Sequence, residues 1–186
     1  MDRLSVFIAV MMIAPATFSA EKEDEQALTM RKDVYEDTIV NGIKHYRLGD
    51  YDKAFDLLGR TAVQGDKESQ YLIGFMYLKG QGVKMHTLRG LAWMQTACES
   101  EMKKWTRDYK KMIKKLNKQQ IARVDQLAAE YIRLYGMEAQ HVTCKKRDLP
   151  GSYRKQFICQ KEAGWVMKGD WDLPSLREFE QYHVNQ

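Results

Sequence analysis

The sequence lacks most of the residue patterns that would mark it as an enzyme. It has no G-x-S-x-G nucleophile motif, no phosphate-binding loop and no dinucleotide fingerprint. It also has no H-x-x-x-H or C-x-x-C spacing, the usual arrangement of zinc ligands. The four histidines are scattered along the chain: His45, His86, His141 and His183. We therefore predict that the protein is not an enzyme and holds neither a cofactor nor a metal ion.

A long apolar run is also missing. Residues 4–14 are apolar, but this run is too short to span a bilayer. Arg3 precedes the run and small residues end it at Ala20, which is the pattern of a secretory signal peptide. We predict a signal peptide over residues 1–20, a flexible acidic lead-in over residues 21–30, and a periplasmic or secreted protein. An uncleaved membrane anchor is the alternative.

What the chain does contain is helical periodicity. Apolar residues recur at helical spacing through residues 31–65 and 67–99, and glycine turns at Gly49 and Gly80 divide each segment into two helices. Leu58 and Trp93 lie 35 residues apart, as do Ala62 and Ala97, so the two hairpins are copies in register. A hairpin of this size cannot bury both faces alone, so the copies are expected to stack. The predicted fold class is mainly α, an α-α superhelix.

A terminal helix pair is predicted over residues 101–135. Its second helix begins at Asn117, which has Gln120 three residues later, the spacing of a capping box. Gly136 ends that helix. This pair would cover the open end of the stack, as repeat proteins require.

Residues 69–97, SQYLIGFMYLKGQGVKMHTLRGLAWMQTA, resemble the Sel-one-like repeat, a relative of the tetratricopeptide repeat. The family pattern is A-x-x-x-L-G-x-x-Y-x-x-G-x-G-V, followed by A-x-x-W-x-x-x-A-A. The positions that match it are Ile73, Gly74, Tyr77, Gly80, Gly82, Val83, Trp93 and Ala97. Small residues replace the family's usual alanines at Ser69, Gly90 and Cys98, and the usual acidic residue after the turn is missing. The first copy, with "GDYDKAF" after its turn glycine, looks like a tetratricopeptide repeat.

The resemblance implies a scaffold whose first helices line a concave binding groove. Aligned on the turn glycines, the residues facing this groove are Ile43, Tyr46, Arg47, Tyr71, Leu72, Phe75 and Lys79. Aromatic side chains beside cations suit a peptide or protein partner. The alternative is that the C-terminal segment folds back and fills the groove.

Residues 141–186 form a small tail with a different pattern. Two short strands, over residues 142–146 and 153–159, flank a predicted type II turn at residues 149–152. In an oxidising compartment, three cysteines make one pair and one leftover thiol. Cys144 and Cys159 lie either side of the turn and are predicted to pair across a bulge or wider loop. A bridge from Cys98 to the tail is the alternative, and a short helix is expected from Ser175 to Tyr182.

The helix over residues 101–116 has one dense basic face, from Lys103 to Lys115. The chain carries a net charge of +5, so weak contact with an anionic surface is possible through this face, whereas a solvated helix face is the simpler interpretation. We expect no nucleic-acid partner.

Taken together, these patterns predict a helical-repeat scaffold that binds a protein or peptide in the cell envelope. One alternative is an envelope enzyme or binding protein for peptidoglycan or β-lactam-like ligands. Some secreted relatives with such repeats bind or slowly hydrolyse β-lactams, but they carry a disulfide within each repeat, and this chain has one cysteine there. A polyanion binder acting through the basic helix is the third possibility.

Overall fold

The computed structural model describes residues 17–148, 156–162 and Leu176. Most of the predicted signal peptide lies outside these residues, so it stays a prediction. The helices are α1 (Thr17–Leu48), α2 (Tyr51–Ala62), α3 (Lys67–Lys79), α4 (Thr87–Ala97), the 3-10 helix η1 (Cys98–Ser100), α5 (Lys103–Ile113) and α6 (Lys118–Tyr135). The strands are β1 (Val142–Arg147) and β2 (Gln156–Lys161). The predicted fold class, mainly α with a small C-terminal β-hairpin, is confirmed.

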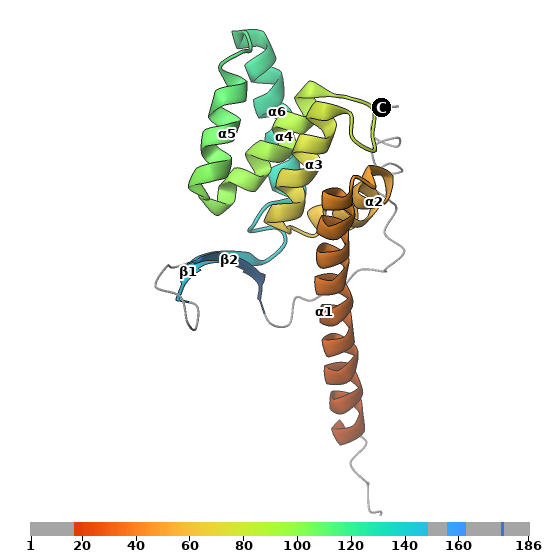
Figure 1. The fold of residues 1–186 in the computed structure, drawn as a ribbon. Coiled ribbons are helices and arrows are strands. Elements are labelled where there is room, and N and C mark those ends of the chain that lie inside the picture. Colours follow the sequence, from red (N-terminus) through yellow and green to blue (C-terminus); the bar gives the residue numbers. More distant parts are fainter. Residues whose placement is uncertain (1–16, 149–155, 163–175, 177–186) are drawn as a thin grey trace, which may run out of the picture.

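The helices pack as stacked hairpins (Figure 1). α1 packs on α2, α2 on α3 and α3 on α4, so each hairpin contacts the next. α6 then packs on α4 and closes the stack. The apolar face of each helix is therefore buried between its neighbours, which is the arrangement that the repeat spacing predicts.

Helix α1 is longer than the sequence analysis predicts. A start near Thr29 to Asp33 is expected, after a flexible lead-in over residues 21–30, but α1 begins at Thr17 and residues 21–30 are helical. The reason is that neither glycine nor proline occurs between Pro15 and Gly42. Glutamate, lysine, glutamine and alanine, which fill this segment, are strong helix formers. The first turns of α1 project away from the other helices (Figure 1).

Small residues set the distance between α3 and α4. A Cβ added to Gly74 would lie 2.8 Å from the carbonyl oxygen of Gly90 and 2.6 Å from Cγ of Met94. Real Cβ atoms do not approach that closely, so a larger residue at Gly74 would push the two helices apart. The small residues of the repeat pattern thus define the tightest helix contact in the second hairpin.

Trp93 is fully buried in the main core. Its indole packs on Tyr131 and Tyr135 of α6, with ring centroids 4.6 Å and 5.5 Å away. Burying Trp93 therefore attaches the terminal helix to the second hairpin.

Two helix starts show how local side chains fix the ends. The capping box of α6 is confirmed, because Gln120 N donates to Asn117 Oδ1 at 2.9 Å and Asn117 N donates to Gln120 Oε1 at 3.0 Å. Thr87 is the first helical residue of α4. His86 caps this helix, since its Nδ1 accepts from the backbone N–H of Arg89 at 3.3 Å.

The β-hairpin is antiparallel, and its disulfide is the predicted one. Cys144 and Cys159 are direct partners in the ladder and are bonded to each other, while Cys98 is free. The ladder ends at the pair Arg147 and Gln156, so the connection is wider than a four-residue turn. This wider loop, rather than a bulge, brings the two cysteines opposite each other. The predicted turn itself, residues 149–152, lies outside the described residues.

The predicted final helix, residues 175–182, is described only at Leu176, which is helical and 2% exposed. Leu176 belongs to the main core, and its Cβ lies 2.9 Å from the position that a Cβ on Gly59 of α2 would occupy. At this residue, therefore, the tail packs on α2, the second helix of its hairpin.

Candidate functional site

The predicted groove residues lie on α1 and α3, the first helices of the first two pairs. Tyr46 and Leu72 are half-buried and pack against the main core, while Arg47 and Lys79 are exposed. Ile43 also packs against the main core, and Phe75 is half-buried. All of the predicted set therefore lies on these two helices, and we use the name concave face for the surface that the sequence analysis predicts from them.

Tyr71 is an exception, because α5 covers it. Its side chain is 5% exposed, and its ring stacks on Trp105 with centroids 4.9 Å apart. The phenol donates to Asp108 Oδ2 at 2.8 Å, and Lys104 Nζ lies 5.1 Å from the ring centroid. Tyr71 is thus a core residue that holds α5 onto α3, rather than a groove residue with a free ring as predicted.

The electrostatics of Tyr71 and Asp108 follow from this contact. Burial, together with the hydrogen bond to Asp108, raises the pKa of Tyr71 well above its usual value. The pKa of Asp108 is lowered, chiefly because its carboxylate accepts this hydrogen bond, and Lys104 and Arg107 add to the effect. The pair is therefore a neutral phenol donating to a carboxylate at physiological pH.

The open part of the concave face combines apolar and charged groups. Lys79 Nζ lies 5.8 Å from the centroid of Phe75, close enough for a cation–π contact. Glu68 on α3 is exposed, and Arg47 on α1 and Lys104 on α5 both stabilise its charge. Its pKa is nevertheless raised, because partial burial and Asp66 outweigh these two cations. Charges on three helices therefore act on Glu68.

A second hollow lies on the basic side of α5. About 720 Å³ in volume, it is lined mainly by cations from this helix, with Cys98, Thr106 and Glu101 completing the wall. The basic face predicted from Lys103 to Lys115 is therefore a shallow groove in part. The pKa of the Cys98 thiol is raised by burial, which keeps the thiol protonated and unreactive at neutral pH.

A third, smaller cavity of about 260 Å³ lies between α1, the α2–α3 turn and the β-hairpin. Three of its lining groups have shifted pKa values. Burial raises the pKa of Tyr35 and of Asp66 and lowers that of Lys161. Two of them have structural partners, because Asp66 Oδ1 caps α3 by accepting from Ser69 N at 2.7 Å and Lys161 Nζ donates to Gln140 Oε1 at 3.4 Å.

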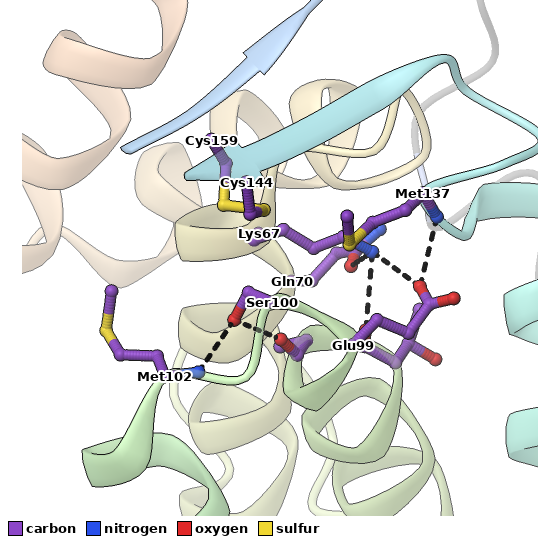
Figure 2. Close-up of a disulfide and its surroundings, with 10 residues drawn as sticks. Lys67, Gln70, Glu99, Ser100, Met102, Met137, Cys144 and Cys159 are labelled. Atoms are coloured by element: carbon purple, nitrogen blue, oxygen red, sulfur yellow. Dashed lines mark hydrogen bonds and ion pairs between the residues drawn. A yellow bond between two sulfur atoms is a disulfide. The ribbon is translucent and has the colours of Figure 1, made fainter. Parts of the chain in front are cut away.

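A buried polar network, which the sequence analysis missed, connects the ends of several helices (Figure 2). Lys67 is 1% exposed, and its Nζ donates to Glu99 Oε2 at 2.7 Å, Gln70 Oε1 at 3.0 Å and the carbonyl of Thr96 at 3.3 Å. Burial lowers the pKa of Lys67, and the hydrogen bond that Lys67 donates to Glu99 opposes that shift.

The same network reaches the terminal helix. Glu99 Oε2 also accepts from Met137 N at 3.1 Å, and Gln70 Nε2 donates to the carbonyls of Ala62 and Tyr135 at 2.9 Å and 2.8 Å. It therefore ties together the ends of α2, α3, α4 and α6. One sequence signal pointed to it: a lysine in the first turn of a helix opposes the helix dipole and needs an acidic partner.

Metal and membrane features are not found in the described ranges. No three His, Cys, Asp or Glu side chains in these ranges come together as potential metal ligands. Within 17–148 and 156–162, no helix combines the length and apolar character needed to cross a bilayer.

The fold and these surfaces define a class of protein, a stack of helical hairpins closed by a terminal helix pair. No family model matches the chain, and no curated protein does. One similar solved structure is c5321, described as a protective antigen present in uropathogenic Escherichia coli strains displaying an SLR fold. The two are 28% identical over 48% of this chain and 20% of that one, with a TM-score of 0.45. This chain thus spans about a fifth of the length of c5321.

Proposed function

We propose that this protein is a helical-repeat scaffold of the cell envelope that binds a protein or peptide along its concave face. The observation that carries the proposal is the composition of that face. Tyr46, Leu72 and Phe75 present half-buried apolar surface on rigid helices, and Arg47 and Lys79 flank them. Aromatic anchors surrounded by charged groups are typical of binding surfaces.

The proposed location rests on two separate observations. The Cys144–Cys159 disulfide suits an oxidising compartment, because cytosolic thiols are kept reduced. The first twenty residues carry a signal-peptide pattern. A periplasmic or secreted scaffold accounts for both.

The cavity at the β-hairpin gives some support to the alternative of an envelope enzyme or a binding protein for peptidoglycan or β-lactam-like ligands. Tyr35, Asp66 and Lys161 converge on it, as titratable groups do in active sites. Because Asp66 caps α3 and Lys161 bonds to Gln140, two of the three groups already serve the fold. The concave face is therefore the better candidate.

Co-purification of the secreted protein, followed by mass spectrometry, tests the proposal. The wild type and the variant Phe75→Ala with Arg47→Glu are compared, with Met85→Ala as a control that changes an exposed apolar residue in the α3–α4 connection. We expect a partner that is retained by the wild type and by the control but lost from the concave-face variant. A partner that all three proteins retain equally would exclude the concave face as its binding site.

A further inference from the structure

The positive charge of this protein is concentrated on α5. Between Glu101 and Lys115 there are seven basic and two acidic residues, a net charge of +5. The whole chain also carries +5, so the remaining residues are balanced. An anionic partner is therefore attracted to one helix rather than to the molecule at large.

Most of these cations form no ion pair with another residue in the described part of the chain. Asp108 lies 3.7 Å from Lys104 Nζ and 3.6 Å from Arg107 Nε. Among the described residues, no ion pair involves Lys103, Lys110, Lys111 or Lys114, and all four side chains are exposed. The charge of this face is therefore available to a partner in solution.

The cations form one row along the groove of about 720 Å³ described above. Those lining it are Lys103, Arg107, Lys110, Lys111 and Lys114, with Glu101 as the one acidic residue in the lining. Apart from the adjacent pair Lys110 and Lys111, successive cations are three or four residues apart, which keeps them on one side of the helix. The row spans about 16 Å at 1.5 Å per residue. An extended peptide of about five residues covers the same length.

The apolar side of α5 faces the protein. Trp105 belongs to a buried cluster, and Met102, Tyr109 and Met112 pack against it. Helices that bind membranes by insertion keep such residues on the outside. A flat bilayer surface also makes poor contact with the floor of a groove, whereas a single extended chain can lie in it.

We propose that this groove on α5 binds an acidic, extended peptide segment of a partner protein. Carboxylates on alternate residues of the segment recur every 6–7 Å or so, whereas cations three or four residues apart on the helix rise by about 4.5–6 Å, so the row offers at least one cation to each carboxylate. Four of the five cations are lysines, which act as point charges. The contact therefore depends on charge attraction rather than on the paired hydrogen bonds that a planar arginine side chain makes with a carboxylate. This surface is separate from the concave face and is an addition to the proposed function.

A labelled peptide of about eight residues that alternates glutamate and alanine is a suitable probe, and the glutamine–alanine peptide of the same length is its control. Binding is measured by fluorescence anisotropy with the full protein. We expect binding of the acidic peptide only, with affinity falling about tenfold or more between about 50 mM and 300 mM NaCl.

The decisive variants remove the same charge from two places. The row variant carries Lys110→Gln, Lys111→Gln and Lys114→Gln. The control carries Lys44→Gln, Lys53→Gln and Lys84→Gln, whose side chains are also exposed. We expect the row variant to lose about tenfold or more in affinity and the control to change by less than about twofold. Thermal unfolding checks that both variants stay folded.

Three results would overturn the proposal. Equal losses in both variants would show that only net charge matters. Failure of the wild type to bind the acidic peptide at low salt would exclude this partner class. Binding to phosphatidylglycerol vesicles that is stronger than peptide binding and lost in the row variant would reassign the groove to a membrane surface. None of these results bears on the concave face, which co-purification tests separately.

Discussion

Lys67 and Glu99 form an ion pair of 2.7 Å between the first turn of α3 and the end of α4, and Lys67 is almost fully buried. Glu99 also accepts from the backbone of Met137, at the exit from α6. One charged pair therefore connects the second hairpin to the terminal helix. The tail begins directly after this point, so the pair also fixes where the β-hairpin starts.

The first prediction concerns this pair. Glu99→Gln leaves the Lys67 ammonium buried without its counter-charge and should lower the free energy of unfolding by about 3–5 kcal/mol. Replacing both residues with methionine should cost less than the sum of the single changes, because no charge is then left unpaired. Urea unfolding of Glu99→Gln, Lys67→Met, Glu99→Met and the double methionine variant measures this. A loss below about 1 kcal/mol for Glu99→Gln would mean that the pair contributes little.

The second prediction compares a core residue of α3 with a residue of the same helix on the concave face. Tyr71→Ala should cost about 3–5 kcal/mol of stability, because it removes a buried ring beneath α5. Phe75→Ala should cost less, since Phe75 is half-buried, and should act mainly on partner binding. Denaturant unfolding of both variants gives the comparison. If Tyr71→Ala were as stable as the wild type, α5 would not cover this ring.

The third prediction is a pH dependence. Burial and the nearby Asp125 raise the pKa of Tyr109 to about 12, and its phenol donates to Gln95 Oε1 at 2.7 Å. The folded protein then holds this proton at pH values where the unfolded chain, with a pKa of about 10, loses it. The stability from Tyr109 is present below pH 10 or so and is lost as the pH rises towards 12.

Spectrophotometric titration tests this directly. In Tyr109→Phe, one phenol that ionises near pH 12 should disappear from the titration curve, and the decline of stability in alkali should become shallower. Disappearance of a phenol that ionises near the ordinary value of about 10 would instead show that Tyr109 is solvated.

The fourth prediction concerns the disulfide. It closes a separation of 15 residues, for which the chain-entropy model gives about 3 kcal/mol. Replacing Cys144 and Cys159 with serine should therefore loosen the tail and make the hairpin sensitive to proteases. In the wild type, proteolysis without reduction should yield a linked peptide with both cysteines, and Cys98 should react with an alkylating reagent after unfolding. A linked peptide that contains Cys98 would contradict the pairing.

Much of the fold could be predicted because local patterns specify it. The 35-residue spacing of Leu58 and Trp93 predicts two stacked hairpins, and Asn117 with Gln120 predicts the start of α6. The cysteine pairing follows from the position of Cys144 and Cys159 within one small segment. Each of these rests on residues close in sequence or on a repeated pattern.

The errors concern contacts between residues far apart. Tyr71 has the spacing of a groove residue, and only the position of α5, some 35 residues later, shows that Trp105 covers it. The network of Lys67 needs Glu99 and Met137 from two other elements. The predicted start of α1 is too late because the prediction rests on the acidic composition of residues 21–30, although no residue there breaks a helix.

Site-specific photo-cross-linking tests the central claim, that the concave face holds the partner, most directly. A photoreactive phenylalanine analogue replaces Phe75 on that face in one protein and Met85, which is 64% exposed between α3 and α4, in the other. Both proteins are expressed from the full sequence and irradiated in cells. The account predicts a cross-linked partner from position 75 and none from position 85. Equal cross-linking from both positions, or cross-linking from position 85 alone, would contradict it.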